Sequence, residues 1–146
     1  MRAAFRHLAG LLACVTLAAA ACSDDNDAIG VMEPPAAIVT AASVVAGEVV
    51  PVRLENRSAR TWSYSMCGKA LLQRRDGDQW TTLPPPLILC ADMLLELPPG
   101  DVVDEEMFVP PATEPGTHRI LVLFELEGEE FDRVTNSFEV TAPPEP

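Results

Sequence analysis

The sequence predicts an all-β domain over residues 36–141, a small sandwich stapled by one disulfide. Proline recurs along this segment, which disfavours helices because proline lacks a backbone N–H and clashes with the preceding turn. Short apolar runs rich in Val, Thr and aromatic residues alternate with turn residues, as in sandwiches and barrels. No segment shows a convincing 3.6-residue period, so the chain offers no amphipathic helix.

Eight segments are expected to form strands, separated by clear turn signals. Residues alternate after Pro51, with Val52 and Leu54 facing the core, and Pro51 itself suggests an edge strand or a strand start. Asp76-Gly77-Asp78 predicts a hairpin turn, and residues 127–130 predict a second one. Prolines and glycines at 98–100 and 114–116 mark further corners. The expected strands are 38–43, 49–55, 61–66, 70–75, 79–83, 102–109, 118–127 and 131–141.

The run 120–124 does not alternate between apolar and polar residues. A continuous apolar strand is usually buried on both faces, whereas a two-layer sandwich buries only one face of each strand. Either a loop of the same chain, such as the apolar stretch 87–97, covers the outer face, or Leu121 and Leu123 form a surface for a partner.

Residues 1–21 have the three parts of a secretory signal peptide. Arg2 and Arg6 give its N-terminal part a positive charge. The apolar run that follows ends in small residues and is too short to span a bilayer comfortably. We expect residues 1–21 to be removed and 36–141 to fold. Between them, residues 22–35 form a flexible acidic tether that ends in two prolines, and residues 142–146 form a proline-rich tail.

The N-terminus resembles the signal and lipobox of bacterial lipoproteins, because Cys22 follows three alanines directly. The resemblance implies that Cys22 becomes the first mature residue, with diacylglycerol on its thiol and an acyl chain such as palmitate on its amine. Ala19 stands where the family prefers Leu, and Cys14 has a closer local match behind a shorter apolar run. Cys14 therefore stays an alternative, as does plain secretion with a cut near Ala21. Ser23 after the cysteine implies the outer membrane in a Gram-negative cell.

The charge of the chain excludes two kinds of partner. Loss of Arg2 and Arg6 would take the formal net charge from −12 to −14. A chain this acidic lacks the basic footprint that nucleic acids require. Anionic lipid headgroups would also repel it, so attachment to a membrane would depend on the lipid anchor.

Two cysteines, Cys67 and Cys90, would remain after processing and lipidation. An even pair in an oxidising compartment is expected to form a disulfide. Closing a loop of this length stabilises a domain by about 3 kcal/mol in the chain-entropy account. The alternative, a redox-active or metal-binding pair, is disfavoured because the sequence has no Cys-x-x-Cys motif and almost no histidine.

No catalytic, metal-binding or cofactor-binding constellation stands out, so we expect no enzyme and no cofactor. A serine triad would have to use His118, and the sequence has no Gly-x-Ser-x-Gly elbow and no phosphate-binding glycine loop. The acids of residues 125–132 could hold Ca²⁺, but a solvated acidic hairpin explains them as well. Trp62, Tyr64 and Trp80 could line a ligand face, although core packing is the more common use of such residues.

The folded segment contains a series of short motifs: Asn56-x-Ser58, Trp62-x-Tyr64, Asp76-Gly77-x-x-Trp80, Leu97-Pro98-Pro99-Gly100, residues 115–120 and residues 137–140. With these motifs it resembles bacterial immunoglobulin-like domains of secreted and lipid-anchored proteins. The resemblance implies a sandwich of about seven strands with Greek-key links and no single activity. His118 stands where such folds often have the tyrosine of the tyrosine corner, and its imidazole is expected to bond the corner backbone.

Together these features predict a lipid-anchored, extracytoplasmic binding or scaffold module of the bacterial cell envelope. Its expected partners are a membrane, reached through the lipid, and an envelope protein or polymer that the sequence does not specify. The alternative is a protease-inhibitor-like module, because the loop 84–90 carries three prolines and the expected disulfide.

Overall fold

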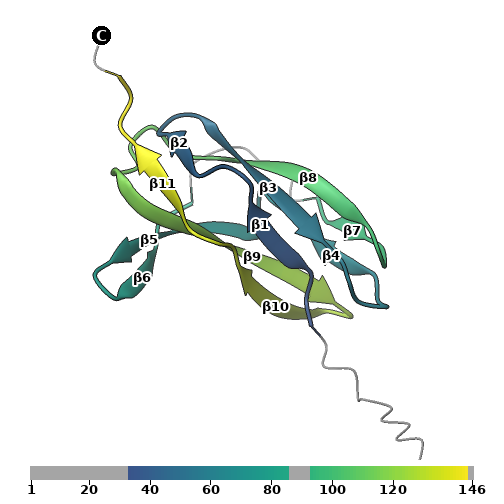
Figure 1. Cartoon of the computed structure of the whole chain (residues 1–146). Helices are drawn as coiled ribbons and strands as arrows, with labels where there is room; N and C mark the ends of the chain where they lie inside the picture. The colour runs from purple at the N-terminus through teal and green to yellow at the C-terminus, as the bar shows by residue number, and fades with distance from the viewer. Residues whose placement is uncertain (1–32, 86–92, 145–146) are drawn as a thin grey trace, which may run out of the picture. The chain divides into compact units, whose positions relative to one another are not determined.

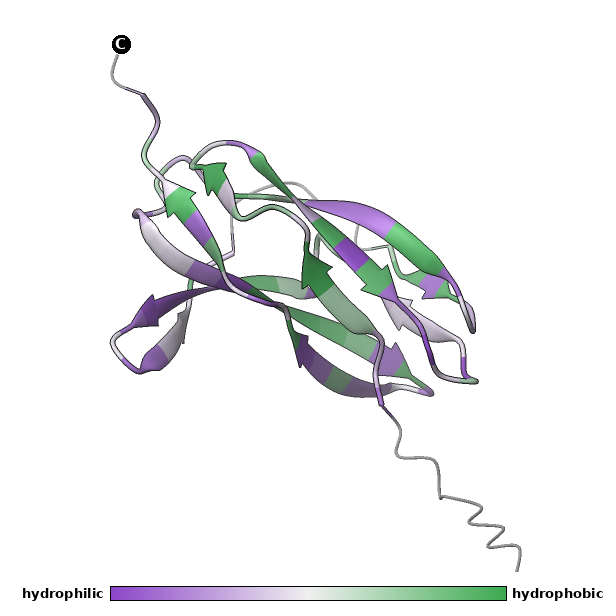
Figure 2. Cartoon of the chain, viewed as in Figure 1, coloured by the Kyte–Doolittle hydropathy of each residue, from purple (hydrophilic) through white to green (hydrophobic). Residues whose placement is uncertain are grey.

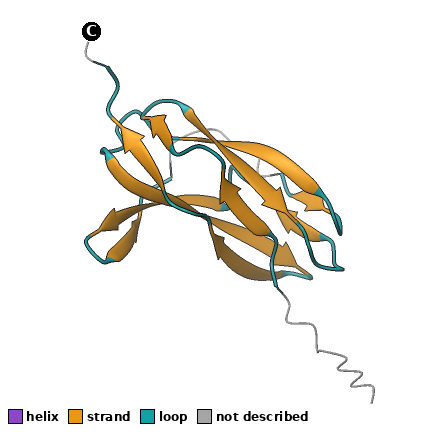
Figure 3. Ribbon diagram, viewed as in Figure 1, coloured by secondary structure: helices purple, strands orange, loops and turns teal. Residues whose placement is uncertain are grey.

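The computed structural model describes residues 33–85 and 93–144, which form eleven β-strands and no helix. They lie in one compact unit, Val31–Pro146. The strands make a three-stranded sheet and an eight-stranded sheet, so the all-β, sandwich-like prediction is confirmed (Figures 1 and 3). The described residues form three strands more than the eight expected segments, because segments 38–43 and 131–141 each overlap two strands and the short strand Leu95–Leu97 had no clear signal. The count of about seven strands that the resemblance implied is not confirmed.

The smaller sheet has the order β1 (Ala36–Val39), β3 (Val49–Glu55), β8 (Val102–Phe108), and both pairings are antiparallel. β3 is therefore the middle strand, although Pro51 suggested an edge. The fold accepts this proline because the ladder between β1 and β3 covers only Val52–Glu55. At Pro51, β3 pairs in register with β8 alone.

The larger sheet is built around β9 (Gly116–Leu126), which has neighbours along both of its edges. β11 (Phe138–Thr141) and β10 (Glu129–Val134) pair along one edge. β5 (Ala70–Asp76) and β4 (Trp62–Tyr64) pair along the other edge. The sheet is completed by β2 (Ser43–Val45) on β11, β6 (Gln79–Thr82) on β5 and β7 (Leu95–Leu97) on β4.

Tight turns join the hairpins as the sequence predicts. β5 and β6 meet at Gly77, whose φ of 63° places it in the left-handed region that glycine adopts without strain. β9 and β10 meet at Glu127 and Gly128, which both have positive φ, at 55° and 87°. Two consecutive positive φ values define the turn type whose twist suits a two-residue hairpin. Figure 2 shows hydrophilic residues on the β5–β6 hairpin.

The long apolar run of β9 is fully buried on only one face of the strand, the face toward the core. Residues 118, 120, 122, 124 and 126 are buried, and the residues between them are half-buried. Leu121 and Leu123 thus lie on the outer face, where Leu71 and Val134 pair with Leu121 from the two neighbouring strands. Val134 is itself exposed, so the outer face is only partly covered.

Aromatic side chains fill the centre of the core. Trp62 is fully buried, and its ring meets Phe124 and Phe131 edge-on, with ring centroids 6.5 and 5.2 Å apart. Tyr64 packs against Phe124 at 6.4 Å. Such edge-on pairs add to the stabilisation that their burial gives. Core packing, the more common alternative for Trp62 and Tyr64, is therefore confirmed.

Two asparagines tie the loops to the strands. Asn136, between β10 and β11, accepts a hydrogen bond from the backbone N–H of Val39 at 2.8 Å and donates one to its carbonyl at 3.0 Å. This contact links the two sheets and explains why the expected strand 131–141 is interrupted. Asn56, after β3, is 1% exposed and bonds to Leu97, Arg60 and Ser58.

Candidate functional site

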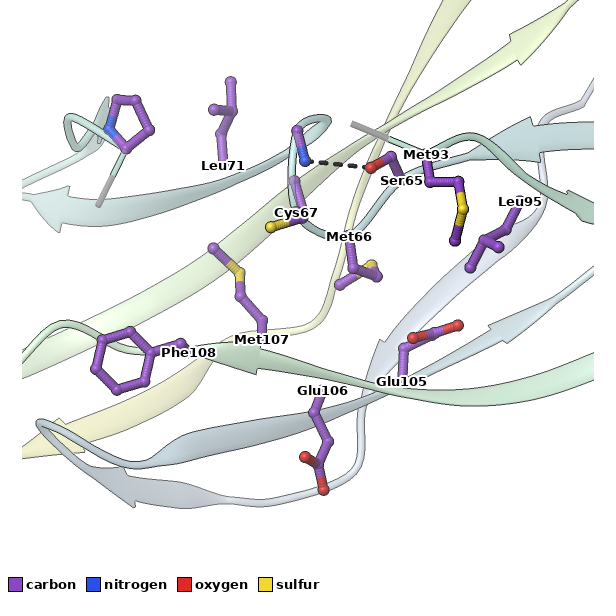
Figure 4. Close-up of a pocket in the computed structure, with 13 residues that line it drawn as sticks. Ser65, Met66, Cys67, Leu71, Met93, Leu95, Glu105, Glu106, Met107 and Phe108 are labelled. Atoms are coloured by element: carbon purple, nitrogen blue, oxygen red, sulfur yellow. Dashed lines mark hydrogen bonds between the residues drawn. The ribbon is translucent and has the colours of Figure 1, made fainter. Parts of the chain in front are cut away.

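A cleft of about 440 Å³ opens beside β8 and faces the turn between β4 and β5 (Figure 4). We call it the β8 cleft. It brings residues of the smaller sheet together with the turn 65–68 and the start of β7. Its lining residues are Ser65, Met66, Cys67, Gly68, Ala70, Leu71, Pro85, Met93, Leu95, Glu105, Glu106, Met107 and Phe108.

The cleft runs along an edge of β8 and not over one of its faces. Four consecutive residues, Glu105 to Phe108, line it. Successive side chains of a strand point to opposite faces. Glu105 and Met107 pair with Val52 and Val50, which are buried, so they lie on the core side. Glu106 lies on the other side, and Figure 4 shows the two carboxyl groups directed away from each other.

That edge of β8 has no strand partner within residues 33–85 and 93–144. β8 pairs with β3 alone in these segments. An edge strand presents a row of backbone N–H and C=O groups that another chain can pair with. The cleft therefore combines side-chain surface with strand backbone.

Methionine dominates the apolar lining. Met66 follows β4, Met93 precedes β7, and Met107 lies near the end of β8. Met107 is buried, whereas Met93 is 63% exposed. Methionine is unbranched and polarisable, so it adapts to ligands of different shape and is common on promiscuous binding surfaces. The cleft volume falls in the usual range of ligand sites, about 300–1,000 Å³.

The charged side chains of the described cleft lining, Glu105 and Glu106, are both acidic. Oε1 of Glu105 accepts a hydrogen bond from the hydroxyl of Tyr64 at 2.6 Å, across the gap between the sheets. Burial, together with this bond and the charge of Glu105, raises the pKa of Tyr64 well above its ordinary value. Neither Glu105 nor Glu106 has an ion-pair partner among the described residues, whose cleft lining contains no basic side chain.

His118 has a structural role in the larger sheet. It is fully buried, and its Nδ1 lies 2.8 Å from the carbonyl oxygen of Gly116. Because a carbonyl only accepts, Nδ1 carries the proton, which confirms the expected bond to the corner backbone. Its Nε2 is buried without a hydrogen-bond partner in the described part of the chain, and its ring packs near Phe138 at 6.3 Å.

Trp80 differs from the other two aromatic candidates. It lies half-buried on β6, where the guanidinium of Arg119 stacks over its ring at 4.3 Å. Nε of Arg119 also donates to Gln73 at 2.8 Å. A cation already occupies the ring face, so this face offers little to a ligand.

Three of the acids of the β9–β10 hairpin, Glu125, Glu127 and Glu130, pair with basic side chains. Nζ of Lys69 lies 2.7 Å from both Glu125 and Glu130, and these contacts raise the pKa of Lys69. Glu127 pairs with Arg60. Within the described segments, no three His, Cys, Asp or Glu side chains are placed to hold a metal ion.

Several predicted features lie outside the described residues. These are Cys14, Cys22, Cys90, the signal and tether up to residue 32, and most of the loop 84–90. Cys67 lines the β8 cleft, while its disulfide to Cys90 stays a prediction, as does lipidation of Cys22. In the described segments, no helix is long and apolar enough to cross a membrane.

Sequence reasoning missed the β8 cleft as a unit. Its residues come from two stretches of chain, 65–71 and 105–108, and from Pro85, Met93 and Leu95. One signal was present, because three of the five methionines lie next to or within expected or observed strands: Met66 after β4, Met93 before β7 and Met107 in β8. Isolated methionines at such positions are usually core residues, so the pattern does not reveal a site without the fold.

The sequence matches no protein-family model and no curated protein. The structure is similar to Pseudomonas fluorescens alkylpurine DNA glycosylase AlkC bound to DNA containing an abasic site analog, with a TM-score of 0.39 and 18% identity over 77% of this chain. This chain spans 32% of the length of that protein. It is also similar to a Niemann-Pick type C2 protein from Japanese carpenter ant, with a TM-score of 0.35 and 15% identity over 69% of this chain and 79% of that one. Likenesses at these TM-scores carry no conclusion about function.

Proposed function

We propose that the protein is a lipid-anchored, extracytoplasmic binding module of the bacterial cell envelope, with the β8 cleft as its binding site. The observation that carries this proposal is an apolar cleft of about 440 Å³ beside a strand edge without a partner in the described segments. Such a place offers both apolar contacts and backbone hydrogen bonds, which are the two requirements for adding a segment of a partner protein.

The use of the titratable residues supports binding over catalysis. His118 is the only histidine after residue 7, and it is buried with its ring bonded to Gly116. Glu125, Glu127 and Glu130 of the β9–β10 hairpin pair with Lys69 or Arg60. These groups serve the fold, and the carboxylates of the β8 cleft stand among apolar side chains.

We further propose that the sandwich is immunoglobulin-like. The path of the chain supports this proposal, because it crosses repeatedly between the two sheets: β3 lies in the smaller sheet, β4 to β7 in the larger, β8 in the smaller and β9 to β11 in the larger. Repeated crossing of this kind accompanies Greek-key connections. The histidine at the corner that opens β9 gives further support.

Metabolic labelling with an alkyne analogue of palmitate tests the anchor. Full-length protein and the Cys22→Ser variant would be expressed in a Gram-negative host, with Cys14→Ser as the matched control. We expect label on the unchanged protein and on Cys14→Ser, and none on Cys22→Ser. Label that disappears with Cys14→Ser, or that never appears, would refute lipidation at Cys22.

Photo-crosslinking in intact cells tests the site. A photoreactive amino acid would replace Leu95, which lines the cleft and is 38% exposed. The control would replace Asp78, at the tip of the β5–β6 hairpin, whose side chain is fully exposed. We expect a discrete adduct from position 95 only. Equal adducts from both positions, or none, would reject the β8 cleft as the binding site.

A further inference from the structure

We infer that the β8 cleft takes an extended, apolar and basic segment of a partner protein, which adds to the edge of β8 as a strand and places a lysine or arginine beside Glu105. This inference deepens the proposed function and rests on it. Three observations carry it: the position of the cleft along a strand edge, the two glutamates of its described lining, which have no basic partner in the described segments, and its methionine-rich wall.

The strand edge favours a polypeptide over a wholly apolar ligand. The groove follows Glu105 to Phe108, and within the described segments only β3 pairs with this strand. An apolar molecule lying there would cover backbone N–H and C=O groups without bonding to them, which costs free energy for each group covered. An added strand pairs with those groups and removes this cost.

The charge selects a basic segment. Oε1 of Glu105 already accepts from Tyr64, and a carboxylate has a second oxygen that can accept further hydrogen bonds. Glu106 adds a second charge on the rim, and neither residue meets a basic side chain in the described segments. The net charge of −12 also attracts basic segments from a distance, which raises the rate of encounter.

The wall of the cleft suits alternation in the added strand. Side chains of a strand alternate between its two faces, so a segment with apolar residues on one face can press them against Met66, Met107 and Leu71. Methionine side chains adjust to apolar groups of different shape, so the cleft does not require one exact sequence. The expected partner segment therefore alternates apolar and basic residues.

The test uses full-length protein purified in detergent and a capped, fluorescein-labelled peptide of nine residues that alternate valine and lysine. Fluorescence anisotropy at low salt measures binding. The first control peptide has glutamate in place of lysine. The second keeps the sequence but carries an N-methyl group on every residue, which removes the backbone N–H donors along both edges of the strand. We expect saturable binding of the lysine peptide, none of the glutamate peptide, and at least about tenfold weaker binding of the N-methylated one.

Three matched variants locate the interaction. Glu105→Gln keeps an oxygen that can accept from Tyr64, and Glu106→Gln lies on the rim, so both should fold. We expect each substitution to lower the affinity for the lysine peptide by about threefold, since a partly exposed charge pair contributes only modestly to binding. Glu129→Gln, an exposed acid of β10 outside the cleft, makes the same change in net charge and should leave binding unchanged.

Equal weakening by Glu129→Gln would mean that the peptide responds only to overall charge, and it would overturn the inference. Undiminished binding of the N-methylated peptide would overturn strand addition. No binding at 1 mM peptide, as expected if another segment of the same chain fills the cleft, would also overturn it. In that last case the crosslinking experiment tests the proposed function separately. An adduct from position 95 alone would keep the β8 cleft as a binding site for a different ligand, and its absence would reject the site as well.

Discussion

Asn56 holds together the corner where β3 ends. Its Nδ2 donates to the carbonyl of Leu97 at 2.8 Å and to that of Arg60 at 2.7 Å. Its Oδ1 accepts from the N–H of Ser58 at 3.0 Å and from its hydroxyl at 2.8 Å. The hydroxyl of Ser58 in turn accepts from Nε1 of Trp62 at 2.9 Å. One buried amide therefore connects β3, β7 and the loop that leads into the central tryptophan.

The Asn56→Ala variant should lose about 3 kcal/mol of unfolding free energy. The carbonyl of Leu97, a fully buried residue, would lose the Asn56 donor, at a cost of about 1–3 kcal/mol for a buried acceptor left unpaired. Loss of the remaining bonds adds about 1 kcal/mol, because the loop 57–61 is mostly exposed and water can replace them there. Asn56→Asp keeps the shape but turns a carboxylate toward two carbonyl oxygens, so it should cost more than the alanine variant.

Urea unfolding, followed by tryptophan fluorescence, measures these differences. Ser58→Ala is the matched control, because it keeps the bonds from Asn56 to Leu97 and Arg60. It removes the hydroxyl that accepts from Nε1 of Trp62, and it should cost about 1–2 kcal/mol. The expected order of stability is unchanged protein, Ser58→Ala, Asn56→Ala, Asn56→Asp. The reasoning is wrong if Asn56→Ala costs under about 1 kcal/mol, or if the aspartate variant is the more stable of the two at position 56.

Three further predictions concern single groups. Tyr64 is the only tyrosine and its pKa is raised, so phenolate absorbance should stay absent at pH 11 in the folded protein and appear near pH 10 in urea. Because the pKa of Tyr64 is higher in the folded than in the unfolded protein, the free energy of unfolding should fall as pH rises above about 10. The hydrogen bond and charge of Arg53 hold the pKa of Asp104 below its usual range, so carboxyl NMR should show a higher pKa for Asp104 in Arg53→Gln. The stability that this pair contributes is present above the ordinary aspartate pKa and is lost as pH falls through the lowered pKa of the folded protein. The free energy of unfolding of His118→Phe, measured with urea, should stay within about 1 kcal/mol of that of the unchanged protein, since Nε2 has no partner in the described segments and only the Gly116 bond is lost. His118→Ala should cost about 3 kcal/mol, because it leaves a cavity.

Local signals carried most of what the sequence predicted about the fold. Residues 49–55 match β3 residue for residue, and Asp76-Gly77-Asp78 marks the β5–β6 turn, because alternation and a left-handed glycine are properties of a few neighbouring residues. The bond from His118 to the corner backbone also follows from a local motif. β7 escaped prediction because three residues are too few to show a period.

The candidate site depended on information that no local pattern contains. Met66 and Met107 are far apart in sequence, and each alone has the appearance of an ordinary core residue. Glu105 and Glu106 belong to an acidic run typical of a solvated edge. Their placement beside a strand edge without a partner in the described segments follows from the sheet order, which sequence periodicity leaves undetermined. The same holds for Pro51, whose tolerance depends on where β1 stops.

The central place of β9 has a consequence for synthesis of the chain. β4 and β5 leave the ribosome well before β9, the strand that both of them pair with. At about 5–20 residues per second, several seconds separate them. During that interval the β5–β6 hairpin can close, but the edges that will meet β9 stay open to chaperones or to other nascent chains. The larger sheet is thus assembled late, and a chain released before residue 116 lacks the strand around which it is built.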